Sequence, residues 1–159
     1  MTDLQLKEIK KEYEKIKDKY NLPDFNLLNA EFEFKPMQVD SSVIKHIARR
    51  MGEKVIYFSR SIDVVLFSFG NSLVLSYENK MLDEEEKKKI IELHKRIMFF
   101  DRGIWVLDIE ENEEEYAKYI KELWKEWFDL KKEVLEYAKK IRDGWKKEYS
   151  NEKSGDYFG

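Results

Sequence analysis

Hydrophobic residues between Asn112 and Tyr149 recur at alternating intervals of four and three. They are Tyr116, Ile120, Leu123, Trp127, Leu130, Val134, Tyr137 and Ile141. This spacing is the heptad seam of helices that pack along one another. A helix over the 37 residues from Glu113 to Tyr149 would span roughly 55 Å. A compact domain of this chain length has a diameter of only about 40 Å, so the helix would extend beyond it. We therefore predict an elongated helical bundle. The alternative is a homodimer, in which the part of the seam that extends beyond one chain packs against a second chain.

Two helices are predicted in the first 30 residues. The first runs from about Asp3 to Tyr20 and ends before Pro23, because the residue that precedes a proline avoids helical geometry. A short second helix follows, with Asp24 as its amino-terminal cap. Residues 31–35 alternate phenylalanine with charged residues, a period of two that predicts an extended segment.

A long helix is predicted over residues 42–69. Its apolar seam consists of Ile44, Ile47, Met51, Val55, Phe58, Ile62, Val65 and Phe69. After Gly52 the helix becomes apolar nearly all round, as at Tyr57, so we expect it to be buried on most sides. Residues 73–77 are too few to classify by periodicity.

A fifth helix is predicted to begin after Asp83, which forms a capping box with Glu86, and to end at Gly103. Residues 104–109 are rich in β-branched side chains and are predicted to be extended, in a two-stranded ribbon with residues 32–34. The sequence thus predicts an all-α, elongated bundle of about five helices. Two of them are long (about 42–69 and 113–149), and the bundle forms a single domain over residues 1–150 with a tail at 151–159.

Composition narrows the class of protein. The 159 residues are 42% hydrophobic and 40% charged, with a net charge of -3 and no cysteine. Disulfides and thiolate chemistry are therefore excluded. The charged amino terminus lacks the apolar core of a signal peptide, and charges at Arg60 and Asp63 interrupt the most apolar segment. We expect a cytoplasmic protein without membrane contact. Lysine outnumbers arginine, which fits a thermophile or an AT-rich genome.

Four charged residues interrupt apolar helix faces. They are Arg60 and Asp63 in the helix at 42–69, and Lys131 and Arg142 in the last helix. A buried charge needs a partner, so we hypothesise one buried polar cluster with Asp63 as acceptor. The alternative is that Lys131 and Arg142 extend to water over neighbouring tryptophans while Arg60 and Asp63 pair locally.

The two histidines, His46 and His94, do not form a recognisable metal or catalytic pattern. Neither belongs to a Glu-x-x-His or His-Glu-x-x-His motif. The six glycines are scattered, without the spacing of a phosphate-binding loop. We therefore expect no cofactor, no metal site and no catalytic residue.

Two surfaces are candidates for binding a partner. A basic face of His46, Arg49, Arg50 and Lys54 could hold an RNA or phosphate backbone, or could be an ordinary solvated face in an acidic protein. The tail ends in Tyr157, Phe158 and Gly159, which could dock in a groove of a partner through the terminal carboxylate. The alternatives for the tail are a disordered end or a segment folded onto its own bundle.

Several short segments resemble a group of small archaeal proteins to which no activity is attached. They are Leu22-Pro-Asp-Phe25, Leu28-Asn29, Phe32-Glu33, Arg49-Arg50 and the closing Asp-Tyr-Phe-Gly. The resemblance implies an archaeal, cytoplasmic setting and no particular chemistry.

The sequence therefore favours a non-enzymatic interaction or scaffold protein that binds another protein. One alternative is a ribosome- or RNA-associated factor that uses the basic face. Another is a small-ligand binder with a polar pocket around Arg60, Asp63, Lys131 and Arg142.

Overall fold

The computed structural model describes residues 3–34, 42–66 and 73–154, and all the regular structure in these ranges is helical. The helices are α1 (Asp3–Tyr20), α2 (Phe25–Phe32), α3 (Val43–Leu66), α4 (Leu73–Lys80), α5 (Glu84–Glu110) and α6 (Glu113–Ser154). The predicted all-α class is confirmed. No helix in these ranges is long and apolar enough to cross a membrane.

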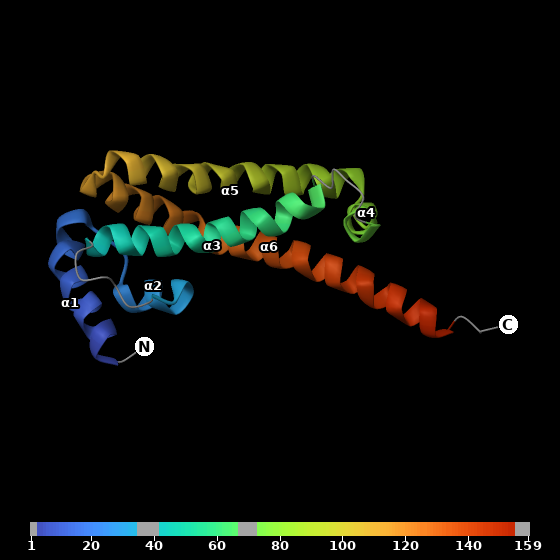
Figure 1. Ribbon diagram of the computed structural model, residues 1–159, viewed down its shortest axis with the longest axis horizontal. Helices are drawn as coiled ribbons and strands as arrows, with labels where there is room; N and C mark the ends of the chain where they lie inside the picture. Colours follow the sequence, from blue (N-terminus) through green and yellow to red (C-terminus); the bar gives the residue numbers. More distant parts are fainter. Residues whose placement is uncertain (1–2, 35–41, 67–72, 155–159) are drawn as a thin grey trace.

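Helices α3, α5 and α6 form the body of the bundle (Figure 1). Helix α5 lies along one edge, while α1 crosses the end of the bundle near the start of α3 and α2 lies beside α3. Helix α6 has 42 residues and α5 has 27, so they span about 63 Å and about 40 Å. The carboxyl-terminal part of α6 therefore diverges from α5 and extends past the bundle, as the elongated prediction requires (Figure 1).

The predicted seam of the last helix is its buried face. Seven of its eight members, from Tyr116 to Tyr137, are buried, and Ile141 is half-buried where α6 leaves the bundle. The seam of α3 is likewise buried at Ile44, Ile47 and Met51. These faces contact each other because each helix can remove its apolar side from water only against another helix.

The prediction for residues 103–109 was wrong. Helix α5 continues through Gly103 to Glu110, and the cap residue Glu111, with a left-handed φ of 51°, closes it. A Cβ on Gly103 would lie 3.4 Å from the ring of Tyr119, so this glycine faces the α6 interface inside the helix. Ile104 and Leu107 are buried, and their packing outweighs the weak helix propensity of β-branched residues.

The extended segment predicted at 31–35 was also wrong where the structure describes it. Glu31 and Phe32 belong to α2, and the cap residue Glu33, with a φ of 52°, closes the helix. Phe32 and Phe34 are both buried, because the chain turns between them. The amide of Phe34 donates to the side chain of Asn29 at 2.9 Å. The described residues therefore contain no two-stranded ribbon.

Helix α3 is less enclosed than expected. Tyr57 is 66% exposed, so the second half of the helix has a solvent side. Residues 67–69, the predicted end of this helix, lie outside the described residues. The unclassified segment after residue 72 is helix α4. Because α5 includes residues 104–110, the two longest helices are α5 and α6, and α3 with 24 residues is third.

An aromatic junction joins α2, α3 and α6. Trp127 of α6 stacks on Phe58 of α3, with ring centroids 5.3 Å apart and planes at 4°. Its other neighbour is Phe32 of α2, at 4.5 Å. The indole Nε1 donates to Glu31 at 2.8 Å, so this buried polar group has a partner. The junction fixes the short helix α2 to the bundle.

Candidate functional site

The predicted basic face on α3 lies beside the carboxyl end of α5, which is acidic. Arg49 Nε donates to Asp108 at 2.8 Å, and Lys45 pairs with Glu111. The hydrogen bond to Asp108 raises the pKa of Arg49, and the hydrogen bond from Lys45 lowers the pKa of Glu111. His46 is half-buried beside them. These positive charges are therefore offset within the chain.

The other cations of this face also have partners. Arg50 pairs with Glu53 one turn along α3, and its second nitrogen donates to the backbone oxygen of Glu33 at 3.2 Å. Lys54 lies 3.8 Å from the carboxylate of Glu33. Arg50 and Lys54 thus attach the end of α2 to α3, so their role in this structure is to join two helices.

The predicted buried polar cluster is not formed. Lys131 pairs with Glu31 at 2.6 Å and is half exposed, and Arg142 pairs with its neighbour Asp143 at 2.8 Å with 70% of its side chain exposed. Arg60 is exposed. Lys131 and Arg142 extend to the helix surface, as the alternative described, because long cationic side chains can keep their charge near water, and there they meet carboxylates. The local pair of Arg60 with Asp63 in that alternative does not describe Asp63, which contacts His94.

Asp63 has a partner that the sequence did not suggest. His94 of α5 places Nε2 2.6 Å from Asp63 Oδ1, and only 12% of the histidine side chain is exposed. Ser59, one turn earlier on α3, is buried and donates to Met98 at 3.2 Å. The contact between His94 and Asp63 connects α5 with α3. Among the described residues no group of three or more histidine, aspartate or glutamate side chains could hold a metal ion.

The predicted docking residues Tyr157, Phe158 and Gly159 lie outside the described residues. Helix α6 continues to Ser154, four residues into the segment that was assigned to the tail. The docking of this tail stays a prediction.

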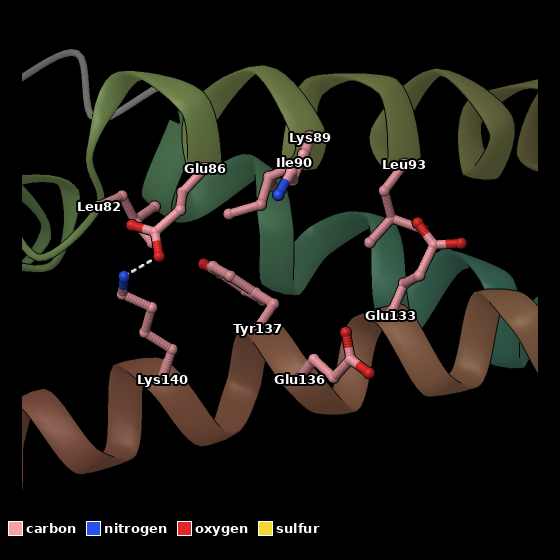
Figure 2. A pocket seen from close by; sticks show the side chains of 9 residues that line it. All are labelled: Leu82, Glu86, Lys89, Ile90, Leu93, Glu133, Glu136, Tyr137 and Lys140. Carbon is pink, nitrogen blue, oxygen red and sulfur yellow. Dashed lines mark hydrogen bonds and ion pairs between the residues drawn. The ribbon is translucent and has the colours of Figure 1, made fainter.

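A cleft of about 380 Å³ separates the start of α5 from the middle of α6 (Figure 2). Its lining residues are Leu82, Glu86, Lys89, Ile90, Leu93, Glu133, Glu136, Tyr137 and Lys140. Glu86 and Lys140 pair across the cleft (Figure 2), and Arg96 holds Glu133 at 2.7 Å. The carboxylates and ammonium groups therefore largely neutralise one another.

Tyr137 is the unusual residue of this cleft. Its side chain points toward the Glu86–Lys140 pair (Figure 2), and its buried hydroxyl has no hydrogen-bond partner among the described residues. Burial, followed by the nearby charge of Glu78, raises the pKa of this hydroxyl, so it stays protonated. An unpaired buried hydroxyl is costly, and the space suits a bound water molecule or a small polar group.

Within the described residues, an exposed apolar surface lies on the second half of α5. Phe99 is 66% exposed, Trp105 56%, Val106 51% and Ile109 83%. With Arg102 these residues form the surface that we call the outer face of α5. Arg102 lies over the Trp105 ring at 4.1 Å and pairs with the buried Asp101 at 3.1 Å. The opposite side of the same helix carries the core residues Ile104 and Leu107, among others.

Sequence reasoning missed this face because residues 104–109 were assigned to a strand. Residues 99, 102, 106 and 109 are spaced three, four and three apart, which is the period of a helix face. A second apolar stripe opposite a buried one was therefore present in the sequence, but the expected break at Gly103 concealed it.

Comparison of the chain with protein-family models, curated proteins and solved structures finds no significant match. The resemblance to small archaeal proteins stays a prediction.

Proposed function

We propose that the protein is a non-enzymatic interaction or scaffold protein, and that it binds through the outer face of α5. The observation that carries the proposal is the exposure of Phe99, Trp105, Val106 and Ile109 on three successive turns of one helix. Contiguous exposed apolar patches on soluble domains mark binding sites more often than chance. The cytoplasmic setting expected from the composition is part of this proposal.

The chemistry of the face supports protein binding. Tryptophan and arginine are the residues most enriched among those that dominate binding energy in protein interfaces. Trp105 and Arg102 lie against each other in the free chain. Each side chain is therefore already partly ordered and loses less conformational entropy when a partner covers it. The opposite side of α5 is held in the core by Phe100 and Ile104. The face is therefore presented on a rigid support.

An RNA- or ribosome-associated function through the basic face draws less support. Arg49, Arg50 and Lys54 each contact a carboxylate of the same chain. Binding to phosphates would have to exchange these contacts, and the net charge of -3 gives no long-range attraction.

Co-purification from the natural host tests the proposal. The full-length chain and a variant with Val106→Glu and Ile109→Glu are recovered under native conditions and their complexes compared. We expect the variant to lose the complex, since two charges would replace apolar contacts. A control with Tyr57→Glu and Leu135→Glu changes exposed apolar residues elsewhere and should keep it. Equal recovery of the complex by all three chains would contradict the proposal.

A further inference from the structure

We propose that the cleft between α5 and α6 binds a small neutral molecule with an apolar body and one oxygen acceptor, such as an alcohol or a ketone. The oxygen would accept a hydrogen bond from Tyr137, and the apolar body would lie against the wall of the cleft. On α5 the lining residues end at Leu93, and the outer face begins at Phe99. This inference therefore goes beyond the proposed function and does not depend on it.

The hydroxyl of Tyr137 is the observation that carries this inference. The residue is 8% exposed, it points into the space between the two helices (Figure 2), and its hydroxyl has no hydrogen-bond partner among the described residues. Burial raises the pKa of the hydroxyl, so it keeps its proton and can donate a hydrogen bond. A buried donor without an acceptor destabilises a folded protein. A ligand oxygen would supply the missing acceptor.

The wall of the cleft is apolar where it meets the core. Leu82, Ile90 and Leu93 are buried and line the cleft. Covering such side chains with an apolar group removes them from water, which favours binding. The volume of about 380 Å³ lies within the range of small-molecule sites. A buried apolar wall with one buried polar group suits a ligand that is itself apolar apart from one oxygen.

The charged residues of the lining favour a neutral ligand. The carboxylates of Glu86 and Glu133 already have cationic partners. The remaining charges, Lys89 and Glu136, are exposed and of opposite sign. An ionic ligand would give up hydration on entering the cleft, and it would meet no net charge of the opposite sign. A neutral molecule avoids this cost.

A ligand oxygen reaches the hydroxyl by displacing the side chain of Lys140. The hydroxyl oxygen has almost no surface open to water, and Tyr137 points toward the Glu86–Lys140 pair (Figure 2). The side chain of Lys140 is 40% exposed. An ion pair with this exposure contributes little to stability, and a lysine can turn its charge to water while its stem stays on apolar surface. The oxygen of the ligand then takes the place beside the hydroxyl.

Titration of the full-length chain with cyclohexanol, followed by NMR of the backbone amides, is the first test. We expect saturable shifts centred on the two segments that line the cleft, 86–93 and 133–140. Tyr137→Phe should weaken binding roughly fivefold, the effect of one neutral hydrogen bond. Tyr57→Phe, at an exposed tyrosine on α3, should not change the affinity. No saturable shift, or equal affinity in all three chains, would overturn the inference.

Two charged molecules with the same ring test the class of ligand. At pH 7 cyclohexylamine is a cation and cyclohexanecarboxylate is an anion. Each should bind more weakly than cyclohexanol, because each loses hydration without gaining an opposite net charge. An affinity for either ion that equals or exceeds the affinity for cyclohexanol would contradict the neutral class.

The stability of Tyr137→Phe without any ligand tests whether the hydroxyl lacks a partner. Phenylalanine keeps the ring and removes only the oxygen, so we expect the midpoint of thermal unfolding to stay the same or rise. An enclosed water molecule that already pairs with the hydroxyl would make the midpoint fall, because its bond would be lost. A lower midpoint would therefore overturn the inference, and circular dichroism checks that the variant is folded.

Discussion

Trp127 and Glu31 are 96 residues apart in the chain, and their side chains are joined by a hydrogen bond of 2.8 Å. The same carboxylate accepts from Lys131 at 2.6 Å. One acidic residue of the short helix α2 therefore holds two side chains on successive turns of α6. This contact gives the first prediction.

Glu31 should make stability depend on pH. Burial opposes its ionisation, but the hydrogen bonds from Lys131 and Trp127 outweigh burial and the pKa of Glu31 is lowered. As pH falls the unfolded chain takes up this proton first, so the contribution is full above the ordinary value of 4.5 and is lost below it. Glu31→Gln should lower the free energy of unfolding at pH 7, with a difference that shrinks as pH falls below 4.5. Urea unfolding at several pH values measures this, and a constant difference would contradict it.

Asp83 should be the residue that fixes the start of α5. Its side chain accepts from the amide of Glu86 at 2.8 Å, and the amide of Asp83 donates in turn to the carboxylate of Glu86 at 2.9 Å. Asp83→Ala should cost about 0.5–2 kcal/mol in the free energy of unfolding. Glu85→Ala, in the same turn but exposed, should change it by less than about 0.5 kcal/mol. Equal effects in urea unfolding would show that the cap is not important.

Met81, the residue that follows α4, lies against Gly144 of α6. A Cβ at this position would overlap Sδ of Met81. Alanine gains about 1 kcal/mol of helix propensity over glycine, and Met81 is a flexible, partly exposed side chain that can move aside at a small cost. We expect Gly144→Ala to raise the free energy of unfolding by less than about 1 kcal/mol in the native chain, and by the full value of about 1 kcal/mol when Met81→Ala is also present. Thermal or urea unfolding of the four chains measures this, and the same change in both backgrounds would contradict the contact.

The basic face should bind RNA weakly or not at all. Arg49 is held by Asp108, and Lys45 by Glu111. In a gel-shift assay at low salt we expect no retarded RNA at micromolar protein. Retardation that disappears with added salt and with Arg49→Gln would show that phosphates displace Asp108, and would revive the RNA-associated alternative.

Hydrophobic periodicity predicted most of the helices, because many residues have a single structural role, either core packing or helix capping. The seam at Ile120, Leu123 and Trp127 is buried as expected, because packing such a stripe against another helix removes it from water. The caps at Asp24 and Asp83 were also predictable, since their bonds depend only on the next three residues.

Errors arose where a local preference was overridden by packing. A glycine at position 103 locally predicts the end of a helix. In the structure Gly103 lies inside α5, where its lack of a side chain lets the ring of Tyr119 pack close to the helix. Lys131 and Arg142 interrupt an apolar stripe, yet they find carboxylates at the surface. The partner of Asp63 could not be found from sequence, because His94 approaches from a different helix. The exposed apolar face on α5, which we propose as a binding surface, was hidden by the first of these errors.

The central claim is that the outer face of α5 is covered when the protein works. The chain has no cysteine, so Ile109→Cys provides one reactive thiol on this face, and Tyr57→Cys provides a matched exposed control. The alkylation rate of each is measured in undiluted extract of the host. We predict slow labelling of residue 109 that becomes as fast as residue 57 after dilution or denaturation. Equally fast labelling of both residues in undiluted extract would contradict the claim.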